Sequence, residues 1–162
     1  MKKALLVIDV QAYFLERSPK DLPARIAGYI RSSNYDFLGF TVFRNVNGSN
    51  WEKSLDWHKS KTDEEVALAS EFSDLVTPEN TFEKHTYSAL KHGSLLDLLK
   101  NKGIEEIHLC GIDTDACILA TAYDAFDQGF RVKILFDLSY SRAGLQEATK
   151  SIALRTIQKD EQ

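Results

Sequence analysis

The chain has 162 residues and a mass of 18.3 kDa, the usual size of one domain, so we expect a single domain over residues 1–162. Hydrophobic residues make up 43% and charged residues 27%, a globular composition that excludes disorder of the whole chain. Twenty Lys and Arg against 24 Asp and Glu leave a net charge of −4, so we expect no nucleic-acid partner.

Short apolar runs alternate with segments of helical spacing along the chain. The runs predict strands at 4–8, 37–43, 104–109 and 132–136, with a short strand at 81–83, and the first run lacks alternation, as expected of a strand covered on both faces. Helical spacing predicts helices at 22–30, 64–72, 95–99 (with Ser94 as N-cap), 116–126 and 143–157. The irregular stretch 45–74 otherwise indicates a long loop. This alternation predicts an α/β fold with a mainly parallel sheet and helices on both faces.

The first apolar run also bears on location. Five apolar residues are too few for a secretory signal, which needs roughly 7 to 15, and no stretch reaches the roughly 18 residues of a membrane span. Cys110 and Cys117 lie too close together to suggest a disulfide framework. We therefore expect a cytoplasmic protein with reduced thiols and no membrane partner.

Three polar side chains follow predicted strands at the edge where ligands bind in such sheets. Asp9 follows the first strand, Lys84 follows the short one, and Cys117 comes soon after the strand at 104–109. Each alone has a simpler interpretation: a turn or capping aspartate, a solvated lysine, a small buried cysteine. Together they favour a nucleophilic site.

The position of Cys117 suits a nucleophile. Asp113 and Thr114 are favoured N-cap residues, so we expect a helix to begin there with Cys117 in its first turn. The positive end of the helix and the nearby Lys84 would lower the thiol pKa, and free amides could hold an oxyanion.

The same residues carry a family resemblance. The segment Gly111-Ile112-Asp113-Thr114-Asp115-Ala116-Cys117, the start Leu5-Leu6-Val7-Ile8-Asp9-Val10-Gln11, and Lys84 followed by Tyr87-Ser88-Ala89-Leu90 resemble three ordered motifs of the isochorismatase-like cysteine hydrolases. That group includes nicotinamidases and N-carbamoylsarcosine amidohydrolases. The resemblance covers nearly the whole chain.

The resemblance implies a Rossmann-type three-layer sandwich with a six-stranded sheet and a triad of Asp9, Lys84 and Cys117. Cys117 would attack a carbonyl carbon and form a thioester, Asp9 would move the proton, and the amides of Asp113 and Cys117 would form the oxyanion hole. A cis peptide bond between Ile112 and Asp113 and self-association into a dimer or larger homo-oligomer are implied as well. Because family members that act on isochorismate lack the cysteine, Cys117 points to cleavage of a C–N bond.

Two features depart from relatives of this kind. Asp56-Trp57-His58 has the local form of a nicotinamidase metal motif, but no further histidine follows at a convincing spacing. We therefore expect no metal and no cofactor, with Asp56 and His58 on a loop surface. Asp113 stands where many amidases have a smaller residue, and we expect its side chain to cap the helix.

The expected partner is a small-molecule substrate. Aromatic walls with few polar anchors are typical of such pockets, so we expect Gln11, Phe14, Tyr87 and one of Trp51 or Trp57 to line it, although each aromatic could instead be core or an interface. Exposed tryptophans would also suit a homo-oligomer. A catalytically silent paralogue that binds a small molecule or a protein, and a flavodoxin-like module, remain as alternatives.

Overall fold

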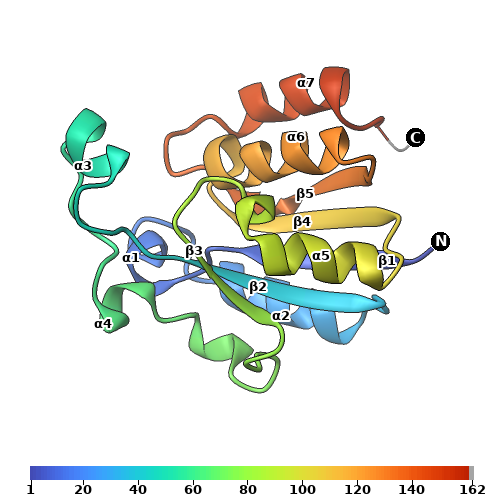
Figure 1. Ribbon diagram of the computed structural model, residues 1–162, viewed down its shortest axis with the longest axis horizontal. Coiled ribbons are helices and arrows are strands. Elements are labelled where there is room, and N and C mark those ends of the chain that lie inside the picture. Colours follow the sequence, from blue (N-terminus) through green and yellow to red (C-terminus); the bar gives the residue numbers. More distant parts are fainter. Residues whose placement is uncertain (161–162) are drawn as a thin grey trace.

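A computed structural model describes residues 1–160, so the last two residues of the expected domain lie outside the described part. It contains one parallel sheet in the order β3-β2-β1-β4-β5 (Figure 1). The strands are β1 (Lys3–Ile8), β2 (Phe37–Phe43), β3 (Thr81–Lys84), β4 (Glu106–Ile112) and β5 (Arg131–Tyr140). The α/β prediction is confirmed, but the described sheet has five strands where six were expected.

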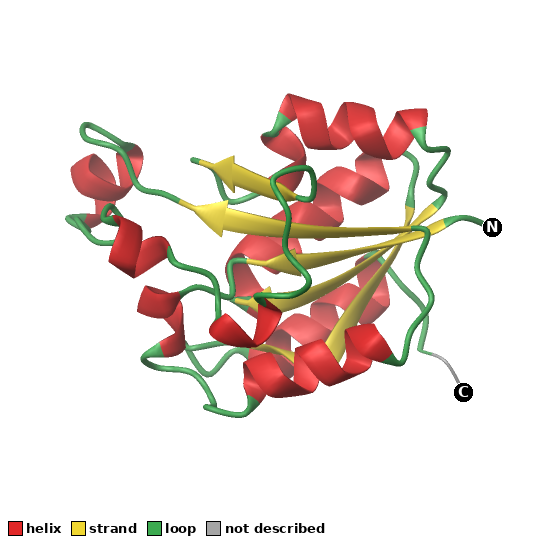
Figure 2. Cartoon of the chain, turned by 90° about the horizontal axis from the view of Figure 1, so that it is seen from below, coloured by secondary structure: helices red, strands yellow, loops and turns green. Residues whose placement is uncertain are grey.

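Helices cover both faces of this sheet (Figure 2). They are α1 (Ala12–Leu15), α2 (Leu22–Arg31), α3 (Asn50–Leu55), α4 (Asp63–Val66), α5 (Gly93–Asn101), α6 (Leu119–Asp127) and α7 (Gln146–Thr156). Short 3₁₀ turns occur at Ser70–Phe72 and Ala89–Lys91, and a π-helical turn at Thr114–Ile118 leads into α6. None of the helices in residues 1–160 combines the length and apolarity needed to cross a membrane.

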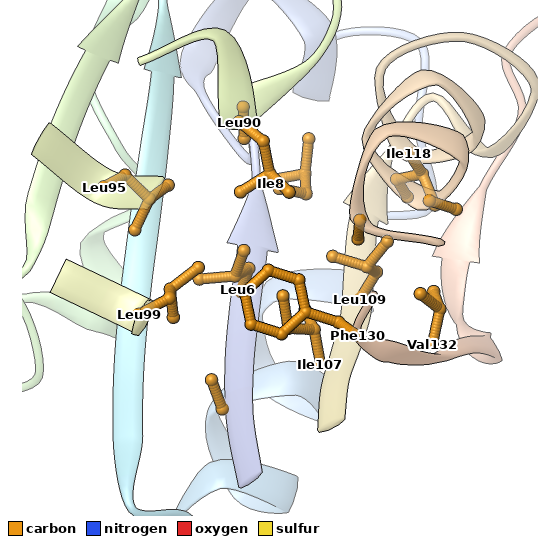
Figure 3. Close-up of a cluster of buried hydrophobic side chains, with 14 of the residues drawn as sticks. Leu6, Ile8, Leu90, Leu95, Leu99, Ile107, Leu109, Ile118, Phe130 and Val132 are labelled. Carbon is orange, nitrogen blue, oxygen red and sulfur yellow. The ribbon is translucent and has the colours of Figure 1, made fainter. Parts of the chain in front are cut away.

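The continuous apolar runs reflect burial of the strands on both faces. Along β1, Leu6 and Ile8 point into a cluster with Leu95 and Leu99 of α5 (Figure 3). The alternate residues of β1 point the other way and pack with α2. All five residues from Ala4 to Ile8 are fully buried, which is why the run lacks polar alternation.

The outer edge of β5 explains the absence of a sixth strand. After β5 the chain forms α7 and returns, and the side-chain amide of Gln158 accepts from the N–H of Ile134 at 2.6 Å and donates to its C=O at 3.4 Å. Gln146 donates to the carbonyl of Phe136 at 2.9 Å. Side chains thus occupy part of the edge where another strand would pair.

The helix predicted over 64–72 is interrupted, because its middle is held in an extended conformation. The carbonyl of Ala67 accepts from the amide of Ala12 at 2.9 Å, and the amide of Ala69 donates to Val10 at 3.1 Å. Only α4 and the turn at Ser70–Phe72 remain helical.

Other element boundaries also differ from the predictions. Helix α5 begins at Gly93 with His92 at the N-cap, not Ser94, because the His92 carbonyl already accepts from the amides of Leu95 and Leu96. The short helices α1 and α3 were not predicted, and α3 is capped by the Ser49 hydroxyl, which accepts from the Glu52 amide. Short helices carry too few residues for a periodic signal.

Candidate functional site

Asp9 directly follows β1 and is fully buried. Its φ of 53° lies in the left-handed region, which turns its carboxylate toward the neighbouring strands. One carboxylate oxygen accepts from the hydroxyl of Thr41 on β2 at 2.7 Å, and the other accepts from Nζ of Lys84 at 2.9 Å. The aspartate is therefore held by groups from two other strands.

Lys84 ends β3, and its side chain is also buried. Its Nζ donates to Asp9, to the carbonyl of Thr86 at 2.7 Å, and points at Sγ of Cys117 from 3.7 Å. Burial would lower the pKa of Lys84, but the negative charge of Asp9 and the sulfur of Cys117 outweigh burial, so the pKa is raised. The lysine is a permanent ammonium group at neutral pH.

Cys117 lies in the π-helical turn Thr114–Ile118, which continues into α6, close to where the sequence placed it. The amides of Ala116 and Ile118 both donate to the Asp113 carbonyl at 3.2 Å, and the hydroxyl of Thr121 donates to the Cys117 carbonyl at 2.7 Å. These bonds fix the backbone that carries the thiol.

The predicted lowering of the Cys117 pKa is wrong. Burial of the sulfur and the carboxylate of Asp9 raise its pKa, and the opposing effect of Lys84 does not compensate for them. The resting group is a thiol beside a carboxylate, so its proton has an acceptor next to it.

The approach of β4 to β1 requires a glycine. Gly111 has a φ of 122°, and a Cβ there would lie 2.1 Å from the carbonyl oxygen of Ile8. One residue further along, the Ile112–Asp113 peptide bond is cis. Within residues 1–160 the amide of Asp113 has no hydrogen-bond acceptor, and Asp113 is the N-cap of the helical turn that carries Cys117. This amide is one of the two that the resemblance implied for an oxyanion.

A cavity of about 210 Å³ opens beside Cys117. Its aromatic walls come from separate parts of the chain and are Phe14, Phe43, Trp51, Trp57 and Tyr87. Both tryptophans belong to a segment around α3 that stands away from the sheet in Figure 1. Phe14, Tyr87 and both tryptophans thus lie where pocket residues were expected.

Gln11 does not line this cavity, although it was expected to. Its side chain is fully buried, donates to the carbonyl of Phe43 at 2.7 Å and accepts from the Phe43 amide at 2.8 Å. It pairs with the end of β2 as a neighbouring strand would, and so positions the Phe43 ring in the wall.

The carboxylate of Asp113 does not cap the helix, because it is engaged elsewhere. It accepts from Nη2 of Arg142 at 2.7 Å, from Nε at 3.0 and 3.1 Å, and from the Arg142 amide at 3.0 Å. The guanidinium lies over the Phe14 ring, 4.5 Å from its centre. Both charged side chains border the cavity.

Arg142 was missed by the sequence reasoning. The strand was predicted to end at 136, whereas β5 continues to Tyr140 and places Arg142 just beyond its carboxyl end. The rule that found Asp9 and Lys84, a polar residue after a strand, would have found it with the correct strand end.

Asp56 and His58 lie beyond the aromatic wall, with 96% and 56% of their side chains exposed. The ring nitrogens of His58 face Asp56 at 2.8 Å and Glu52 at 3.4 Å, and Glu52 also pairs with Lys61. Within residues 1–160, no group of three or more His, Cys, Asp or Glu side chains is arranged to hold a metal ion. The residues described therefore do not fit the metal site that the motif suggests.

Comparison with known proteins identifies relatives of this chain. A family model described as the Isochorismatase domain matches residues 3–159. Nicotinamidase 3 from Arabidopsis thaliana is 37% identical over 90 residues, which cover 54% of this chain and 44% of that protein. Maleamate amidohydrolase from Pseudomonas putida is 28% identical over 151 residues, which cover 83% and 70%. The chain thus spans less than half the length of some curated relatives that it matches.

Solved structures share the fold. An isochorismatase-like hydrolase from Alkaliphilus metalliredigens superimposes with a TM-score of 0.83, covering 98% of this chain and 93% of that one at 21% identity.

Proposed function

This chain belongs to the isochorismatase family, and from that premise we propose that it hydrolyses a C–N amide-type bond of a small molecule by way of a Cys117 thioester. Two relatives are named for amide hydrolysis, which supports this reaction class. The observation that carries the proposal is the position of Cys117, which borders the cavity and is 3.7 Å from Lys84, itself 2.9 Å from Asp9.

Acylation begins with transfer of the Cys117 proton to Asp9. The sulfur then bonds to the amide carbon, and the carbonyl oxygen becomes an oxyanion that the amides of Asp113 and Cys117 can meet. The C–N bond breaks as Asp9 returns the proton to the leaving nitrogen. The ammonium of Lys84, 2.9 Å from the Asp9 carboxylate, holds it in place for the first transfer and stabilises the negative charge that develops on the sulfur.

Deacylation repeats these roles with water. Asp9 accepts a proton from the attacking water while the water oxygen bonds to the thioester carbon. The C–S bond then breaks, the sulfur recovers the proton from Asp9, and the carboxylic acid product leaves. Asp9 thus acts as the base in both steps. The raised pKa of the Cys117 thiol favours its return to the neutral resting form once the product leaves.

The test is release of ammonia from a panel of small amides that includes nicotinamide, maleamide and maleamate. We expect turnover of at least one amide, its loss in Cys117→Ala, and a mass increase on Cys117 when the acyl-enzyme is trapped by acid quench. Binding of an amide without turnover would instead assign the silent-paralogue alternative.

We also propose that the protein self-associates and resides in the cytoplasm. Three exposed apolar side chains, Leu55 (61% exposed), Tyr87 (45%) and Val46 (41%), line one surface hollow next to the cavity, which supports a subunit contact there. Two unpaired cysteines suit a reducing compartment. A light-scattering mass near 18.3 kDa would refute self-association, and cell fractionation tests the location.

A further inference from the structure

The cavity beside Cys117 is bordered by only two charged side chains in the described part of the chain, Asp113 and Arg142. Asp9 and Lys84 lie behind the thiol and are buried. Whatever charge the substrate carries away from its scissile bond must therefore be matched by this one pair.

Asp113 and Arg142 form an ion pair with each other. The Asp113 carboxylate takes Nε, one Nη and the backbone amide of Arg142, in a bidentate geometry at 2.7–3.1 Å. The side chains are 16% and 19% exposed, so neither charge is strongly screened by water. The cavity accordingly presents no uncompensated charge.

A carboxylate on the substrate would have to displace Asp113 from the guanidinium or lie against it. Either arrangement leaves a desolvated anion without a partner, which binding sites strongly disfavour. An uncharged group has no such difficulty. Nη1 of Arg142 has no acceptor within residues 1–160, and the stacked Phe14 ring holds the guanidinium plane in place.

We infer that Asp113 is a specificity-determining residue: it supplies from within the chain the negative charge that Arg142 would otherwise take from a substrate. The pocket therefore selects small amides that are uncharged away from the scissile bond, with a carbonyl or ring nitrogen to accept from Arg142. It rejects amides that carry a carboxylate. This inference rests on the proposed function for the reaction but concerns binding alone.

The test compares maleamide with maleamate, which share a skeleton and differ in one terminal amide or carboxylate. Binding is followed by fluorescence, because both tryptophans of the chain border the cavity. Cys117→Ala is the background, so no product forms. We expect the parent, which keeps Asp113, to bind maleamide more tightly than maleamate. Asp113→Asn frees Arg142 and should shift the ratio of the two Kd values toward maleamate by about tenfold or more.

Two further variants keep the test decisive. Asp74→Asn removes the carboxylate of another arginine pair, that of Arg31, and should leave the ratio unchanged. Arg142→Met leaves Asp113 unpaired and should weaken maleamate further, an outcome that does not depend on Asp113→Asn folding.

An unchanged ratio in Asp113→Asn, equal binding of both ligands by the parent, tighter maleamate binding in Arg142→Met, or no fluorescence response in any variant would each overturn the inference. Charge-selective binding without ammonia release from the Cys117 protein would overturn the proposed function alone.

Discussion

Two hydrogen-bonded clusters, each with buried and partly buried members, lie at opposite ends of the same sheet. The carboxyl-end cluster consists of Asp9, Thr41, Lys84 and Cys117. The amino-end cluster consists of Tyr29, Tyr35, His108 and Glu106, joined by contacts of 2.7, 2.6 and 2.5 Å. Both hold groups whose pKa values are displaced from their ordinary values, raised for Cys117 and Tyr35 and lowered for His108.

The difference between the clusters lies in what each leaves available. In the amino-end cluster, the hydroxyls, the imidazole and the carboxylate satisfy one another. In the carboxyl-end cluster, a thiol borders a cavity, and the nearby amide of Asp113 has no acceptor in the described part of the chain. A displaced pKa therefore does not by itself mark a site; a nucleophile with room for a substrate does.

Asp9→Asn should have the largest effect on the carboxyl-end cluster. We expect turnover to fall by about 10²–10⁴-fold, because the base that takes the thiol proton is lost. Alkylation of Cys117 by iodoacetamide should become faster at a given pH, since the Asp9 carboxylate raises the pKa of the thiol. Peptide mass spectrometry measures both cysteines, with buried Cys110 as the internal control. Retained turnover or slower alkylation would contradict the assignment.

Lys84→Met should act on the thiol in the opposite direction. Loss of the ammonium raises the pKa of Cys117 further and slows its alkylation. It also leaves Asp9 buried without a counter-charge, which should lower the free energy of unfolding by about 3–5 kcal/mol. Urea unfolding measures this, with exposed Lys100→Met as the matched control.

The pH dependence of that stability difference has a defined sign. Because the pKa of Lys84 is raised in the fold, its contribution is complete below the ordinary lysine pKa of about 10.4 and is lost as pH rises through the folded value. The difference between the wild type and Lys84→Met should thus stay constant from neutral pH to about 10. A decline already near neutral pH would show that the lysine is not held as an ammonium.

Thr41→Val tests how far the orientation of Asp9 matters within the carboxyl-end cluster. The hydroxyl at 2.7 Å orients the Asp9 carboxylate, so its loss should lower kcat by about tenfold with little change in KM, and the free energy of unfolding by about 1 kcal/mol. Thr41→Ser keeps the hydroxyl and should restore kcat. An equally impaired serine variant would assign the effect to packing.

His108→Gln is the counterpart in the amino-end cluster and should have the smallest effect. We expect unchanged turnover and a loss of about 1 kcal/mol from the hydrogen bonds to Tyr35 and Glu106. Burial lowers the pKa of His108, so the unfolded chain binds the proton more readily and wild-type stability should fall as pH drops below about 6.5. Urea midpoints at pH 5 and 7 should show a smaller fall in the variant; a steeper one would reverse the sign.

The strands and three of the four side chains of the carboxyl-end cluster, all but Thr41, could be predicted for one reason. In a parallel sheet, residues that follow the strands converge at one edge whatever the loops do. Asp9 and Lys84 needed only the ends of their apolar runs, and Cys117 needed only the start of its helix. The sixth strand came from resemblance alone, and the side chain of Gln158 now occupies part of that edge.

Other properties depend on partners distant in sequence. The residue types of Asp113 and Gln11 suit a helix cap and a pocket anchor. In the fold, Asp113 instead accepts hydrogen bonds from Arg142, and Gln11 donates one to the backbone of Phe43. The pKa of Cys117 likewise follows from how many atoms surround the sulfur, which no local motif reports.

The parallel α/β architecture and the convergence of an acid, an ammonium and a thiol follow from the order of residues alone, because hydrophobic period and strand ends are local properties. Two other properties depend on the folded arrangement: the raised pKa of the Cys117 thiol beside Asp9, and the ion pair between Asp113 and Arg142, which leaves the pocket without a net charge. Burial and ion pairing depend on residues far apart in the chain, and these meet only when the sheet is assembled.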